Sequence, residues 1–341
     1  MSDRAILQRA FIAQTDWADA RIAPLAGDAS NRRYLRLRRA TTGETAVLMD
    51  APPEKGEDVR PFLRIARYLT GLGLSAPRIL AEDKANGLLI LEDLGDALFA
   101  RIIPEDAALE LPLYTAATDL LAELHRHAPP PDLAPYSPDV MADMAALAFD
   151  WYLVGATGDI GTKRAGFRTA IKIALATHAF EANVLIQRDY HAENLLWLPD
   201  REGVARVGLL DFQDAMRGHP AYDLVSILQD ARRDVSGAVE KSMIARYIDM
   251  TGTDPARFET AYHCIGAQRN LRILGVFARL CIRDGKAHYV DLIPRVWAHL
   301  ERDLSHPAMG PVAAMARAVL PPPTPPVLQR LKDQCASRPI R

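Results

Sequence analysis

Two aspartates and one asparagine have the types and the order that phosphoryl transfer from ATP requires. Asp189 can accept the proton of an attacking hydroxyl group, and Asn194 and Asp211 can hold the Mg²⁺ that offsets phosphate charge. The alternative is that such residues only cap the backbone of loops, which is the better explanation for a single aspartate. Because three suitable side chains occur in order, the sequence favours a catalytic base and two metal ligands.

Short apolar segments predict how these side chains are positioned. Residues 184–186 form an apolar strand that ends just before the first aspartate, and residues 195–198 form a second strand. The intervening segment 199–203 is rich in turn-forming residues, and residues 204–210 return as a third strand that delivers Asp211. The sequence therefore predicts two loops joined by a hairpin.

Composition excludes several other classes of protein. The chain has 341 residues, 49% of them hydrophobic and 25% charged, and its net charge is −2. A charge near zero gives no reason to expect a nucleic acid or an anionic membrane as partner. We find no N-terminal signal segment and no apolar run long enough to span a bilayer. The three cysteines lack metal-like spacing, so we expect a cytoplasmic protein with reduced thiols.

The loop sequence resembles the aminoglycoside phosphotransferase family, a branch of the protein-kinase-like superfamily. That family has His-Gly-Asp-x-His-x-x-Asn, followed by a strand ending in Ile-Asp-Phe or Ile-Asp-Trp. The chain matches at Asp189, His191, Asn194 and 211–212, and has Gln187 in place of the first histidine. The resemblance implies an ATP-dependent kinase that uses Mg²⁺ and a small-molecule acceptor.

The resemblance also implies an α+β, two-lobed, protein-kinase-like fold. Residues 1–95 would form a small nucleotide-binding lobe of sheet plus helix, and residues 96–341 a larger, mostly helical lobe for catalysis and acceptor binding. Glu92, Asp93 and Leu94 would form the hinge that contacts adenine. ATP would lie between the lobes, where ligands are often bound.

The predicted nucleotide site departs from the family at one charged pair. A small-residue loop containing Ser30 and Asn31 can bring backbone N–H groups to a phosphate. Kinase-like enzymes then place a Lys or Arg on the third strand and a Glu on the next helix. Here the corresponding residues are Met49 and Phe62, which make an apolar pair.

Another cation must then neutralise phosphate, and the candidates are Arg32 and Arg33. Side chains alternate along a strand, so Arg33 shares a face with the apolar Leu35 and Leu37. The resemblance implies that the apolar face of the first hairpin covers the nucleotide, which favours Arg33 over Arg32 as the phosphate ligand, because Arg binds phosphate in a bidentate manner. The alternative is that both arginines are solvated charges at the end of a strand.

Further expectations concern the C-terminal part of the chain. Asp223 lies in a Gly-x-Pro-x-Tyr-Asp-Leu motif, in which the family uses the aspartate to brace the catalytic loop. We expect helices over 107–127, 139–155, 164–180 and 261–284. The proline-rich segment 129–138 is expected to be an exposed connector, and a loose tail is expected from residue 321.

Motifs at 49–53, 210–215 and 275–286 are similar to one subgroup, the bacterial anomeric kinases of cell-wall amino sugars. These enzymes phosphorylate N-acetylmuramate and N-acetylglucosamine at C1 during cell-wall recycling. A row of arginines on helix 261–284 would repel cationic antibiotics and suits a neutral or carboxylate-bearing sugar. The candidate acceptor-binding residues are His191, Glu193, Trp151, Arg269 and Arg272.

Two other functions remain open at this point. The missing charged pair fits a pseudokinase that binds a nucleotide and regulates a partner, although the intact Asp189, Asn194 and Asp211 argue against it. A kinase for aminoglycosides or other hydroxyl compounds is the second alternative. Release of ADP with Mg-ATP and a panel of sugars would distinguish a sugar kinase from a pseudokinase, and drug resistance on expression would reveal an antibiotic kinase.

Overall fold

The computed structural model describes residues 3–25 and 31–338, and its contacts divide the chain into two compact units. Unit 1 contains residues 1–120 and 192–215, and unit 2 contains residues 121–191 and 216–341. The fold is α+β, as predicted, with the large sheet in unit 1 and most helices in unit 2. The two units have other bounds than the predicted lobes, because residues 96–120 and 192–215 group with the sheet. The lobe boundary at residue 95 stays a prediction.

Unit 1 is built on a five-stranded antiparallel sheet in the order β1-β2-β3-β5-β4. The register pairs Tyr34 with Met49 and Arg36 with Val47, so these four side chains share one face. Its strands are β1 (Ala20–Pro24), β2 (Arg33–Arg39), β3 (Thr45–Asp50), β4 (Ile79–Asp83) and β5 (Leu88–Glu92). Its helices are α1 (Asp3–Ala13), α2 (Arg60–Gly71), α3 (Phe99–Glu105) and the start of α4 (Glu110–Leu124).

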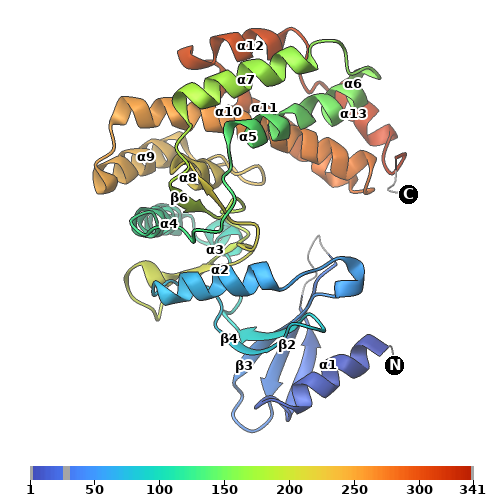
Figure 1. Ribbon diagram of the computed structural model, residues 1–341, viewed down its shortest axis with the longest axis vertical. Helices are drawn as coiled ribbons and strands as arrows, with labels where there is room; N and C mark the ends of the chain where they lie inside the picture. Colours follow the sequence, from blue (N-terminus) through green and yellow to red (C-terminus); the bar gives the residue numbers. More distant parts are fainter. Residues whose placement is uncertain (1–2, 26–30, 339–341) are drawn as a thin grey trace. The chain divides into compact units, whose positions relative to one another are not determined.

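The opposite face of this sheet packs against α1. Leu37, Leu48 and Ile90 form an apolar cluster with Ile12 and Trp17, and all five are nearly inaccessible to solvent. Helix α2 runs across the sheet in Figure 1 and buries Phe62 and other apolar residues on its inner side.

The predicted catalytic hairpin is present in unit 1. Strands β7 (Leu195–Trp197) and β8 (Val207–Leu209) are antiparallel and pair Leu195 with Leu209. The returning strand begins later than predicted, because residues Gly203–Arg206 form a 3₁₀ turn. In unit 2, the strand that precedes the aspartate, β6 (Val184–Ile186), pairs with β9 (Met216–Gly218).

Unit 2 is mostly helical, and the 28-residue α10 (Pro255–Ile282) runs through it. Figure 1 shows α12, α7 and α10 following one another in a stack. Gly275 lets α10 approach α5 closely, since a Cβ atom there would lie 2.2 Å from the carbonyl carbon of Leu147. The other helices are α5 (Pro138–Leu147), α6 (Val154–Thr157), α7 (Arg164–His178), α8 (Ala221–Leu228), α9 (Gly237–Thr251), α11 (Ile293–Leu304), α12 (Gly310–Arg317) and α13 (Pro325–Asp333).

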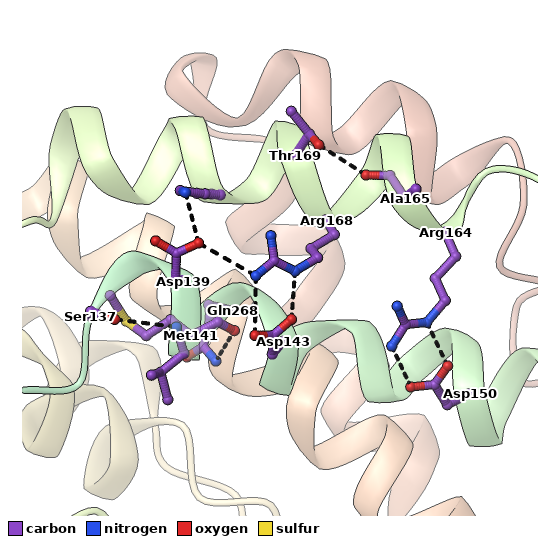
Figure 2. A network of polar contacts seen from close by, with 12 residues as sticks. Ser137, Asp139, Met141, Asp143, Asp150, Arg164, Ala165, Arg168, Thr169 and Gln268 are labelled. Atoms are coloured by element: carbon purple, nitrogen blue, oxygen red, sulfur yellow. Dashed lines mark hydrogen bonds and ion pairs between the residues drawn. The ribbon is translucent and has the colours of Figure 1, made fainter.

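Ion pairs join α5 and its π-helical extension to the antiparallel α7. Figure 2 shows Arg164 on Asp150 and Arg168 on Asp143, with Nε–Oδ1 distances of 2.6 and 2.5 Å. These pairs are partly solvated, and such pairs contribute little to stability. They show which turns of the two helices lie opposite each other.

The expected helix 139–155 is interrupted, because residues Ala148–Leu153 adopt π-helical geometry.

Two expectations about exposed segments need correction. The proline-rich connector is exposed only in part: residues 131–132 and 134–135 are exposed, but Leu133 and Tyr136 are buried, and the Tyr136 N–H donates to the Arg217 carbonyl at 2.7 Å. After residue 321 the chain forms α13, whose Leu331 is fully buried. Both segments contain prolines but also apolar residues that pack against distant helices. Among the described residues, no helix is long and apolar enough to cross a membrane.

Candidate active site

A cavity of about 340 Å³ lies within unit 1, on the face of the sheet that α1 leaves open. This volume is within the range of small-molecule pockets. Strand β2 contributes Tyr34 and Arg36, β3 contributes Val47 and Met49, and the segment after β5 contributes the predicted hinge. The remaining lining residues are Leu25, Phe62, Pro77, Leu91, Gly95, Asp96, Leu98, Arg101, Glu193, Asn194, Leu196, Leu210, Asp211 and Gln213.

The two predicted metal ligands lie together in this cavity. The Asn194 side-chain amide donates to Oδ2 of Asp211 at 3.4 Å, and the Gln213 amide donates to Oδ1 at 2.5 Å. Asp211 has φ +57°, an unfavourable value for a residue other than glycine, as is common at functional sites. Mg²⁺ prefers carboxylate and amide oxygens. The Asp211 carboxylate and the Asn194 amide oxygen therefore suit a bound Mg²⁺.

The apolar pair that replaces the usual Lys and Glu also lines the cavity. Met49 and Phe62 are both buried, and neither leaves an unpaired charge behind. The Phe62 ring stacks on Phe212, with ring centroids 5.0 Å apart. Phe212 directly follows Asp211, so this aromatic contact links α2 to the segment that carries the predicted metal ligand.

The predicted orientation of Arg33 is wrong. Leu35 and Leu37 face α1 rather than the cavity, so the strand alternation places Arg33 on that side too. Arg33 is exposed and is absent from the cavity lining. Arg32 lies on the other face, where its Nε donates to Glu57 at 2.9 Å. The prediction failed because the face with more apolar residues is the one covered by the helix.

Two cavity arginines were not identified from the sequence. Arg36 is paired with Asp93 at 2.7 Å and with Asp96 at 2.8 Å, so much of its charge is already neutralised. Arg101 projects from α3 and is exposed. No local motif marks Arg101, because α3 is a short helix interrupted by Pro104.

The predicted hinge residues Glu92, Asp93 and Leu94 all line the cavity. Glu92 is also held by Arg201, whose Nη2 donates to Oε1 at 2.7 Å. Asn31 lies outside the cavity lining, and its backbone N–H donates to Glu57 at 3.2 Å. Ser30 lies outside the described residues. The adenine-binding and phosphate-loop roles remain predictions.

Asp189 lies in unit 2, on the loop that follows β6. The buried Asp223 accepts the backbone N–H groups of Gln187 and Arg188 at 2.6 and 2.9 Å. The brace implied by the family motif is thus made by two hydrogen bonds. Burial raises the pKa of Asp223 to about 7, while the two N–H groups act in the opposite direction. Arg188 adopts φ +73°, so the residue before Asp189 is held in a strained conformation.

Asp189 interacts electrostatically with two cations of α10. Against the effect of burial, its charge favours the protonated forms of Arg269 and Arg272 and so acts to raise the pKa of each. Burial opposes the Arg272 cation, yet Tyr222, Tyr136 and Asp189 together raise its pKa above the ordinary value. Positive charge on α10 near Asp189 disfavours a cationic acceptor at this place.

The other candidate acceptor residues have different surroundings. Burial, followed by the charge of Arg232, lowers the pKa of His191 to about 3, so its ring is neutral at pH 7. Glu193 is exposed and lines the cavity of unit 1. Trp151 lies in the π-helical segment and is half-buried. Arg269 is only 4% exposed, so it is no part of a solvated arginine face.

The fold and these side chains define a kinase-like phosphotransferase, and comparison with known proteins agrees. The chain belongs to the phosphotransferase enzyme family, whose model matches residues 21–259. This membership makes it an ATP-dependent kinase with a hydroxyl acceptor.

Two curated relatives are named N-acetylmuramate/N-acetylglucosamine kinase. The relative from Caulobacter vibrioides is 39% identical over 92% of this chain and 96% of its own length. The relative from Pseudomonas aeruginosa is 33% identical over 86% and 88%.

Solved structures share the fold at lower identity. A microcompartment-associated aminopropanol kinase has a TM-score of 0.60 and 18% identity, covering 89% of this chain and 99% of that one. The ADP-bound aminoglycoside phosphotransferase APH(2'')-Ib has a TM-score of 0.58 and 14% identity, with coverage of 88% and 97%.

Proposed function

We propose that this kinase transfers the γ-phosphoryl group of ATP to the anomeric hydroxyl group of N-acetylmuramate or N-acetylglucosamine. The observation that carries the proposal is the shared identity with curated relatives of that name over nearly the whole chain. The interaction of Asp189 with Arg269 and Arg272 supports it, because two nearby cations suit a neutral sugar or one with a carboxylate and disfavour a polycationic antibiotic.

Each side chain has a distinct role in the proposed mechanism. Asp189 accepts the proton of the C1 hydroxyl group as its oxygen attacks the γ-phosphorus in line with the leaving ADP. Asn194 and Asp211 would hold Mg²⁺, which neutralises phosphate charge when bound. The hinge residues 92–94 would contact adenine. Of the two candidate arginines of α10, Arg272 is the more exposed and is the one proposed to contact the acceptor.

The anomeric product can be tested directly. Phosphorylation at C1 locks the sugar ring and removes the reducing aldehyde, whereas phosphorylation at C6 leaves it intact. The protein is incubated with Mg-ATP and each sugar, and ADP and reducing sugar are measured in the same samples. We expect one reducing end lost for each ADP formed. ADP release without loss of reducing sugar would reject the anomeric assignment and leave the kinase assignment intact.

A further inference from the structure

A buried hydrogen-bond chain leads from helix α10 to the residue before the proposed catalytic base. Nη2 of Arg269 lies 2.6 Å from Oγ of Ser226, and Oγ of Ser226 lies 3.4 Å from the carbonyl oxygen of Arg188. Ser226 is fully buried and Arg269 is 4% exposed. All three residues belong to unit 2, and Arg188 is followed directly by Asp189.

The chemistry of the three groups determines which group donates and which accepts in each hydrogen bond. A guanidinium group has donors and no acceptor, so Ser226 must accept the hydrogen bond from Arg269. The single proton of the hydroxyl group then points to the Arg188 carbonyl, the acceptor within reach. A bond from a charged donor also polarises the hydroxyl group and strengthens the donation that follows.

Ser226 acts on the same residue as the family's bracing aspartate, but from the other side. Asp223 and Ser226 are three residues apart on α8, so their side chains project from one face of the helix. Asp223 accepts the N–H of Arg188, while Ser226 donates to its carbonyl oxygen. The backbone of Arg188 is therefore held at both polar groups, which maintains the strained φ of +73°.

The arrangement is unfavourable for stability alone. Nε and Nη1 of Arg269 are buried and have no hydrogen-bond partner among the described residues. Burial lowers the pKa of Arg269, which means that the cation is held at a cost. An apolar side chain would fill the same space without that cost. The buried guanidinium is thus better explained by the geometry it imposes on the loop.

We propose that Ser226 and Arg269 are positioning residues for Asp189, with Arg269 orienting the Ser226 hydroxyl group and that group holding the Arg188 carbonyl. The inference rests on the proposed function in so far as Asp189 is the catalytic base. It adds a second hydrogen-bonding contact to the catalytic loop, independent of Asp223.

Four variants test the role of the hydroxyl group. Ser226→Ala removes the hydroxyl group. Ser226→Thr and Ser226→Val have side chains of the same shape, but only Thr keeps the hydroxyl group, so any strain from the larger side chain is common to both. Thr118→Val is the matched control, since Thr118 is fully buried and its hydroxyl group donates to the Tyr114 carbonyl at 2.8 Å within α4. For each variant, kcat, both KM values, the unfolding midpoint and hydrogen–deuterium exchange of the segment 184–194 are measured.

We expect Ser226→Ala and Ser226→Val to lower kcat about 10- to 100-fold, because a displaced base loses near-attack geometry. KM for ATP should stay within about twofold, since the nucleotide contacts are untouched. Hydrogen–deuterium exchange at residues 187–190 should accelerate in these two variants. Ser226→Thr keeps the hydroxyl group and should therefore retain most of the wild-type activity. Thr118→Val should match wild type in kcat and in exchange.

The involvement of Arg269 is tested by a double-mutant cycle. If Arg269 acts through Ser226, Arg269→Met and Ser226→Ala together should lower kcat no more than the more harmful single change. Multiplicative effects of the two changes would show that Arg269 acts independently of Ser226, and would refute the proposal that Arg269 acts through the Ser226 hydroxyl group.

The exchange measurement keeps this inference separable from the proposed function. If the wild-type protein phosphorylates no sugar, the proposed function fails, but faster exchange at 187–190 in Ser226→Ala would still support the hydrogen-bond chain. Unchanged exchange in that variant, or kcat within twofold of wild type in an active enzyme, would refute the positioning role.

Discussion

The ring of Phe62 stacks on that of Phe212, with centroids 5.0 Å apart and an angle of 26° between the planes. One ring comes from the position where kinase-like enzymes carry a glutamate, and the other follows Asp211, the proposed metal ligand. An apolar contact here needs no buried charge and avoids the desolvation cost of an ion pair. The loss of the usual charged pair is therefore compatible with an ordered site, which weakens the case for a pseudokinase.

The stacking predicts a defect in both stability and nucleotide binding for Phe62→Ala. Truncating a buried Phe costs about 3–5 kcal/mol, and it would also release the segment that carries Asp211. We expect a lower unfolding free energy and a higher KM for ATP. Phe167→Ala is the control, because Phe167 is fully buried in unit 2 and its ring centroid lies 4.6 Å from that of Phe149. An equal rise in KM for both variants would contradict a specific role for Phe62.

Asp189→Asn should abolish phosphoryl transfer and leave nucleotide affinity nearly unchanged. Removal of a general base lowers rates by about 10²–10⁴, while the nucleotide-lining residues stay in place. Kinetics and calorimetric titration with Mg-ATP measure the two properties. Near-normal turnover would exclude Asp189 as the base.

Asp211→Asn should instead weaken nucleotide binding that depends on Mg²⁺, because it removes one carboxylate ligand. Its hydrogen-bond partners Asn194 and Gln213 can still contact the amide, so we expect little change in folding. The comparison is made by titrating ATP with and without Mg²⁺. A variant whose ATP affinity responds to Mg²⁺ as wild type does would refute the assignment.

Arg101→Gln should raise KM for ATP about threefold or more, whereas Arg33→Gln should leave it within twofold. Both arginines are exposed, so the two changes remove the same charge at a similar cost to folding. Only Arg101 lines the cavity. If Arg33→Gln has the larger effect, the phosphate lies on the opposite side of β2 from the described cavity.

Stability should fall as the pH drops below 6.5. Burial lowers the pKa of His125 and of His191 to about 3, and of His219 and of His299 to about 4, from 6.5 in the unfolded chain. A depressed folded-state pKa gives stability that is present above pH 6.5 and lost as the pH falls towards 4. Each group can add a slope of up to about 1.4 kcal/mol per pH unit.

His125→Gln tests this acid sensitivity. Nδ1 of His125 lies 2.7 Å from the Tyr247 hydroxyl oxygen, and glutamine can make such a contact without titrating. As the pH falls from 6.5 to 4, we expect the unfolding free energy of wild type to decrease relative to that of the variant, as measured by urea titrations. A constant difference over this range would show that His125 does not contribute.

Local patterns in the sequence determined the chemistry and much of the secondary structure. The order of Asp189, Asn194 and Asp211 indicated phosphoryl transfer, and the turn-rich segment between two apolar runs predicted the β7–β8 hairpin. Strand alternation likewise placed Arg33 on the face of Leu35 and Leu37. These features depend on neighbouring residues, so they can be predicted without the tertiary fold.

The tertiary structure decided which face of an element meets which partner. Alternation cannot say whether the face of Leu37 covers a nucleotide or packs against α1, because the cluster with Ile12 joins residues far apart in sequence. Helical spacing grouped Arg269 with other arginines, but only the packing of α8 on α10 buried it against Ser226. Burial comes from contacts between distant segments, and no local pattern encodes those contacts.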